Sequence, residues 1–218
     1  MVDGGWLLHQ IGWRDGQTFA EIGGQYVSFI KRKAAGRRGT VVFDSYVSSP
    51  KDHKHTKRAK EDVGGIQLMV VPNEKCSLSK EKFLGNKTNK SNFIGYLSQL
   101  ISERPDLKSK TANDDCDTLL VKEAITCSAT STVEVIAEDC DILVLLLYHG
   151  ESSGNEIFFS TSKGTFNIKE ISANLTDNEC NRLLFIHSFY RCDTVSVIYR
   201  HSKVAILKKL CTKQRRMT

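Results

Sequence analysis

The sequence contains no long hydrophobic run. Its longest apolar stretch, from Ile142 to Tyr148, is far shorter than the ~20 residues that a helix needs to cross a membrane. No apolar segment followed by a cleavage site stands near the amino end either. We therefore expect a protein that is neither secreted nor inserted in a membrane, and that works in the nucleus or the cytoplasm.

Paired cysteines and an excess of acid are also missing. The seven cysteines are an odd number, and no two have the CxxC spacing of zinc sites and redox motifs. Reduced thiols in an intracellular protein are the interpretation that fits this pattern. Asp and Glu number 25 against 31 Lys and Arg, which gives a formal net charge of +6. Such a charge favours an anionic partner, and nucleic acid is the one that we expect.

Length and hydrophobic content fit one α/β domain. The chain has 218 residues, 40% of them hydrophobic, without internal repeats or low-complexity segments. Apolar β-branched runs alternate with helical patterns, which predicts a parallel sheet. We expect strands over 40–44, 133–138 and 155–160, and helices after Asp3 and over 18–33, 50–60, 79–101, 115–127, 141–149 and 178–189. For residues 61–80 a strand and an irregular segment are equally supported.

Seven aspartates stand beside separate apolar runs: Asp3, Asp44, Asp115, Asp117, Asp139, Asp141 and Asp193. In an open parallel sheet, ligands bind outside the carboxyl ends of the strands, so these side chains are expected to meet in one crevice. Gathered carboxylates repel one another unless cations compensate them, and their hard oxygen atoms suit Mg²⁺ or Mn²⁺. The sequence therefore predicts one shared divalent-metal site.

Helix capping is the alternative role for some of these acids. Asp115 and Asp139 stand where helices are expected to begin, and for each residue alone capping and metal binding are equally supported. A cap accounts for one Asp per helix. It leaves unexplained the repeated Asp-Cys-Asp at 115–117 and 139–141.

Two basic segments accompany the acids. A helix that begins at Pro50 places Lys51 and Arg58 nearly on one face, where they can act on a phosphate beside the acids. Composition alone favours a solvated basic helix or a nuclear-import patch instead. The amphipathic stretch from Ser79 carries four further candidates for nucleic-acid binding, Lys80, Lys82, Lys87 and Lys90. For any one of these four, a solvated helix face is the ordinary alternative.

The segments DGGWLLHQ, VVFD, DDCDTLL, AEDCDILVLL and CDTVSVIYRHSKVAILKKL resemble the flap-endonuclease branch of the PIN-like nucleases. The similarity covers nearly the whole chain, 1–218, and is greatest to uncharacterised animal PIN-like proteins. It implies a PIN-like (Rossmann-like) parallel sheet flanked by helices, with an arch-like or variable segment at 61–112. It also implies that the seven aspartates hold two divalent metal ions, and that Lys51 and Arg58 are catalytic.

The chain departs from the family pattern in its glycines. The family's helix-turn-helix element corresponds to 190–211, but Arg200 and Ser202 replace two glycines whose backbone grips duplex phosphates. Arg200, His201 and Lys203 are still expected to bind phosphate by charge. Ser45 and Arg191 also stand where the family has glycine. Because only two residues precede Asp3, where the family has a full strand, Asp3 is expected to be loosely held.

Two functions of different class follow. The first is a metal-dependent nuclease that cleaves structured or single-stranded nucleic acid, with DNA favoured over RNA. The second is a catalytically impaired nucleic-acid-binding or scaffold protein, derived from a mobile element or a truncated copy. The altered glycines favour the second and the complete set of acids favours the first. A small-molecule phosphate-ester hydrolase is a weaker third interpretation, which the basic segments oppose.

Overall fold

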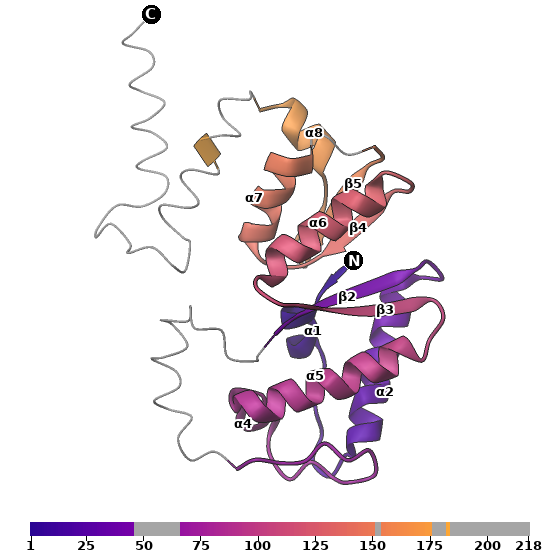
Figure 1. Ribbon diagram of the computed structural model, residues 1–218, viewed down its shortest axis with the longest axis vertical. Helices are drawn as coiled ribbons and strands as arrows, with labels where there is room; N and C mark the ends of the chain where they lie inside the picture. The colour runs from indigo at the N-terminus through magenta and orange to yellow at the C-terminus, as the bar shows by residue number, and fades with distance from the viewer. Residues whose placement is uncertain (46–65, 151–153, 176–181, 184–218) are drawn as a thin grey trace, which may run out of the picture.

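A computed structural model of the chain describes residues 1–45, 66–150, 154–175 and 182–183 (Figure 1). Its sheet has the strand order β3-β2-β1-β4-β5-β6. The strands are β1 (Val2–Asp3), β2 (Gly39–Asp44), β3 (Leu107–Ala112), β4 (Val133–Ile136), β5 (Ile157–Thr161) and β6 (Gly164–Asn167). All neighbouring pairs are parallel except β5 and β6. The protein is therefore α/β with a mostly parallel sheet, as expected, and is compatible with a Rossmann-like fold.

Helices cover both faces of the sheet. They are α1 (Gly4–Gln10), α2 (Phe19–Ala34), α4 (Lys80–Gly85), α5 (Lys87–Ser102), α6 (Cys116–Ser128), α7 (Cys140–His149) and α8 (Ile168–Ala173). Successive side chains of a strand point to opposite faces. Val41 and Phe43 accordingly join an apolar cluster with α1, α2, α4 and α5, whereas Val42 joins a cluster with α6, α7 and α8. These two groups of helices lie apart in Figure 1.

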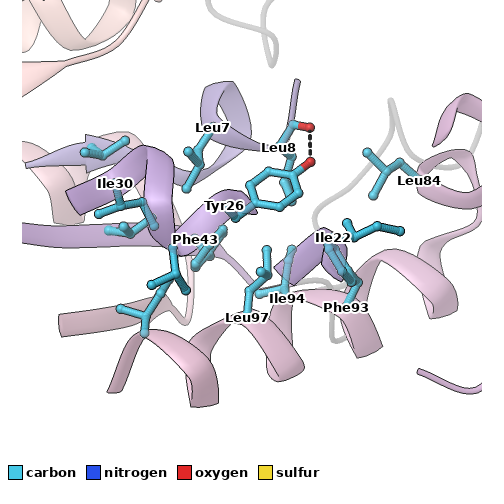
Figure 2. Close-up of a cluster of buried hydrophobic side chains, with 14 of the residues drawn as sticks. Leu7, Leu8, Ile22, Tyr26, Ile30, Phe43, Leu84, Phe93, Ile94 and Leu97 are labelled. Atoms are coloured by element: carbon cyan, nitrogen blue, oxygen red, sulfur yellow. Dashed lines mark hydrogen bonds between the residues drawn. The ribbon is translucent and has the colours of Figure 1, made fainter. Parts of the chain in front are cut away.

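The first cluster fixes α1 against α2. Helix α2 begins at a capping box, in which Thr18 Oγ1 accepts from the Glu21 N–H and the Glu21 carboxylate accepts from the Thr18 N–H. Tyr26, fully buried in α2, donates its hydroxyl to the Leu8 carbonyl oxygen at 2.7 Å (Figure 2). Trp13 Nε1 donates to the same Tyr26 hydroxyl at 3.2 Å. These buried hydrogen bonds help to fix the position of α1, which begins directly after Asp3.

The structure differs from expectation between 66 and 112. The single helix expected from Ser79 is divided at Asn86, which ends α4 and caps α5 with its side chain. Residues 66–79 form neither helix nor strand apart from one bridge at Lys75. Asn89 ties this segment to α5, because its fully buried amide bonds the Leu68 N–H and the Ile66 carbonyl oxygen. Strand β3, unexpected within the predicted variable segment, pairs with β2 at the sheet edge.

Candidate functional site

Asp3 ends β1, in the middle of the sheet, and caps α1. Its Oδ1 accepts a hydrogen bond from the Gly5 N–H at 2.8 Å. Gly4 packs so closely on β2 that a Cβ atom there would lie 2.3 Å from Phe43 Cδ1 and 2.6 Å from the Val42 carbonyl oxygen. Strand β1 also pairs with a strand on each side. The structure thus holds Asp3 firmly, in contrast to the loose placement expected for so short a strand.

Asp44 and Asp139 follow the two strands that flank β1. Asp44 is the last residue of β2, and Asp139 lies three residues after the end of β4. Asp139 caps α7, since its Oδ1 accepts from the Asp141 N–H at 2.9 Å. Because these strands run parallel, their carboxyl ends lie at the same edge of the sheet. The edge therefore carries acids from three adjacent strands.

The pair Asp115 and Asp117 begins α6, close to the end of β3. Asp115 is exposed, and its carboxylate accepts from the N–H and the hydroxyl of Thr118. It caps the helix and does not line the cavity described below. Asp117, one residue into the helix, is half-buried and lines that cavity. The two acids of this Asp-Cys-Asp repeat therefore have different surroundings.

An open cavity of about 710 Å³ lies at this edge of the sheet. Its lining comes from the ends of β1 and β2, from α1, from the first turn of α6, and from the segment between β4 and α7 with the first turn of α7, together with one residue of α5. The lining residues are Asp3, Gly5, Trp6, His9, Asp44, Lys90, Cys116, Asp117, Glu138, Asp139, Cys140 and Asp141. Five of the seven predicted aspartates meet here, although they are spread over most of the described chain.

Burial and neighbouring negative charges raise the pKa of two of these acids, Asp117 and Asp3. Burial, followed by the negative charges of Asp115, Asp139, Asp3 and Asp44, raises the pKa of Asp117 from 3.8 to about 7. Burial is also the largest cause that raises the pKa of Asp3, while hydrogen bonds from the backbone oppose it. The cavity therefore disfavours the charged forms of Asp117 and Asp3 when no cation is bound.

The donor atoms fit a hard divalent cation. Carboxylate oxygens are the ligands that Mg²⁺ and Mn²⁺ prefer. One oxygen each of Asp139 and Asp141 and the sulfur of Cys140 lie within 4.8 Å of one another. The Cys116 thiol contributes little to such a site, because burial first and the nearby acids second raise the pKa of Cys116 well above its usual range. Cys116 Sγ instead donates to the Val42 carbonyl oxygen at 3.3 Å.

Sequence reasoning did not assign Trp6, His9 or Glu138 to the site, and it predicted Lys90 for nucleic-acid binding without placing it beside the acids. Trp6 and His9 of α1 and Lys90 of α5 line the same cavity, as does Glu138, whose side chain accepts from the Ser162 N–H. Burial first, then the charges of Lys80 and Lys90, lowers the pKa of His9. The available signal was helical spacing, because Trp6 stands three residues after Asp3 and His9 three residues further on.

The predicted nucleic-acid-binding lysines have unlike surroundings. The Lys80 ammonium donates to the carbonyl oxygens of His9 and Ile11, at 3.0 and 2.7 Å, and so closes the end of α1. Lys82 is exposed on α4 and Lys87 begins α5, whereas the fourth lysine, at position 90, lines the cavity. The remaining predicted residues lie outside the described part of the chain: Lys51, Arg58, Asp193, Arg200, His201 and Lys203. The helices expected near Pro50 and at 190–211, and most of that at 178–189, lie there too.

Fold and cavity together define an α/β protein with an acidic cavity at the carboxyl edge of its parallel strands. Comparison of the chain with protein-family models, with curated proteins and with solved structures found no match. Among the described residues, no helix is both long and apolar enough to span a membrane.

Proposed function

We propose that the protein is a divalent-metal-dependent nuclease of the PIN-like type, which hydrolyses phosphodiester bonds in nucleic acid. One observation carries the proposal: aspartates from four separate segments line one open cavity. They are Asp3, Asp44, Asp117, and the pair Asp139 and Asp141. The carboxyl edge of a parallel sheet is where such folds bind ligands, and about 710 Å³ is enough space for a nucleotide.

The five aspartates of the cavity would share one task. Asp3, Asp44, Asp117, Asp139 and Asp141 would hold Mg²⁺ or Mn²⁺. Ions of this kind, when bound, activate water and stabilise the leaving oxygen of a phosphodiester. Backbone N–H groups fix the carboxylates of Asp3 and Asp139 before any ligand arrives. The cavity is thereby preorganised, which lowers the cost of binding.

Positive charge within the same cavity supports a phosphate substrate. Lys90 of α5 lines the cavity together with the five aspartates and Glu138. A cation in this place attracts the substrate backbone and opposes its repulsion from the carboxylates. The roles proposed for Lys51, Arg58 and Asp193, and the PIN-like type itself, rest on the sequence resemblance. So does the proposed phosphate-binding element at 190–211.

The test is incubation of the full chain with labelled flap, hairpin and single-stranded substrates, as DNA and as RNA. We expect cleavage with Mn²⁺ and none in EDTA. Asp141→Asn removes one ligand charge at nearly constant volume, and is expected to abolish cleavage while the fold and binding persist. Binding without cleavage in either Mg²⁺ or Mn²⁺ would overturn the nuclease and leave the impaired nucleic-acid-binding or scaffold protein. Equal cleavage by Asp141→Asn would show that another site is responsible.

A further inference from the structure

A band of aromatic and basic side chains begins at the cavity and continues onto α2. Trp6 lines the cavity, and its ring centroid lies 6.1 Å from that of Phe29. The guanidinium carbon of Arg32 lies 5.3 Å from the Phe29 ring centroid, and Lys33 Nζ lies 5.9 Å from it. We call Trp6, Phe29, Arg32 and Lys33 the aromatic–basic track.

The composition of the track favours an anionic ligand. Arg32 and Lys33 are exposed, follow the equally exposed Lys31, and place two positive charges beside one ring. Cations in the last turn of a helix are favourable in themselves. The rings of Trp6 and Phe29 pack against the core cluster but remain partly exposed, and they connect these cations to the acidic cavity. A polyanion with apolar faces fits both halves of the track.

We propose that the aromatic–basic track binds a single-stranded segment of nucleic acid that leaves the cavity. Trp6 contacts the base next to the reacting phosphate, and Arg32 and Lys33 bind phosphates further along the strand. Aromatic rings interleaved with cations bind single strands with little sequence preference, because every base has a face that can stack. In a duplex the bases are stacked on each other and do not reach Trp6. The inference rests on the proposed function, since it takes the cavity as the cleavage site.

Tryptophan fluorescence tests the contact with the base. The chain has two tryptophans, and Trp13 is held away from the track by Tyr26, Phe83 and Phe93. Trp13→Phe leaves Trp6 as the only reporter, and Trp6→Phe leaves Trp13. Each variant is titrated in EDTA, which prevents cleavage, with a labelled oligothymidylate of about 20 nucleotides. We expect quenching in Trp13→Phe and none in Trp6→Phe, while anisotropy shows binding in both.

Salt dependence tests the phosphate contacts. Arg32→Gln with Lys33→Gln should reduce the slope of log affinity against log salt by roughly 1.4, which is 0.7 for each neutralised phosphate of a single strand. The matched control is Lys122→Gln with Lys163→Gln, which removes two exposed cations from α6 and from the turn between β5 and β6. Its slope should equal that of the parent.

Three results would overturn the track: no binding of the oligothymidylate by the parent, an unchanged salt slope in the Arg32 and Lys33 double variant, or bound strand without a Trp6 response. Each is separable from failure of the nuclease, because these measurements need no cleavage. A protein that cleaves with Mn²⁺ but shows an unchanged slope is a nuclease without this track. A protein that binds through the track and never cleaves would support the track and contradict the proposed nuclease activity.

Discussion

Replacement of Asp117 by asparagine should stabilise the metal-free protein at neutral and alkaline pH. Burial, and then the charges of Asp115, Asp139, Asp3 and Asp44, raises the pKa of Asp117 from 3.8 to about 7. At 1.36 kcal/mol for each pKa unit, this rise corresponds to about 4 kcal/mol of folding free energy. Local relaxation and water near the half-buried carboxylate reduce the effect, so we expect roughly 2 to 4 kcal/mol.

The sign follows from proton binding. Between pH 3.8 and about 7, the folded protein retains a proton on Asp117 that the unfolded chain has released. The free energy of unfolding therefore falls as pH rises through this window, and the loss is complete above it. Asparagine has nearly the same volume and no charge. Parent and variant should thus be equally stable near pH 4, and differ most near about pH 8.

Urea unfolding in EDTA across this pH range measures the difference directly. Asp15→Asn is the matched control, because Asp15 is exposed in the turn before α2 and its replacement should leave the profile unchanged. Mn²⁺ should stabilise the parent more than Asp117→Asn and so narrow the gap at high pH. If the free energy of unfolding depended on pH in the same way for the parent and for Asp117→Asn, the pKa of Asp117 would not be raised in the folded protein.

Three further variants test other parts of the structure. Asp141→Asn should lower Mn²⁺-dependent cleavage by at least about 100-fold, with binding in EDTA retained or improved, and unaltered turnover would contradict its place among the ligands. Gly4→Ala forces a methyl group against Phe43 and should cost about 1 to 3 kcal/mol in urea unfolding; a parent-like midpoint would show that α1 shifts freely. Asn89→Ala leaves the Leu68 N–H and the Ile66 carbonyl oxygen without their partner and should speed hydrogen exchange at 66–71. Exchange confined to other segments would refute that anchoring role.

The sequence predicted those strands whose hydrophobic pattern matches their burial in the folded protein. Residues 40–44 are β-branched and apolar because β2 is buried on both faces, and the observed strand, Gly39–Asp44, is longer by one residue. Strand β3 has the sequence LKSKTA and only two buried residues, since it lies at the sheet edge. Polar edge strands carry little hydrophobic signal, so β3 could be identified only through its pairing with β2.

The acids of the site were predictable, and Lys90 was predicted as one of four nucleic-acid-binding lysines, whereas Trp6 and His9 were not predicted. Each aspartate stands beside an apolar run, and parallel pairing brings the strand ends together whatever lies between them. Trp6, His9 and Lys90 enter the cavity through the packing of α1 against α2 and α5, which depends on contacts such as that of Tyr26 with Leu8. Such tertiary contacts cannot be derived from the sequence locally, and the spacing of Asp3, Trp6 and His9 on one helix face was the signal that was available.

The central place of β1 has a consequence for how the site is assembled. Val2 pairs with Val41 on one side and with Ile136 on the other, so the middle of the sheet closes only after a segment more than a hundred residues away has been synthesised. Folding that depends on contacts between such distant segments is slow, because closing a long loop costs entropy before the contacts form. We therefore expect Asp3 and Asp139 to come together late in folding, so that their mutual repulsion opposes closure of the sheet. A cation that relieves it should chiefly slow unfolding and leave the early folding steps unchanged.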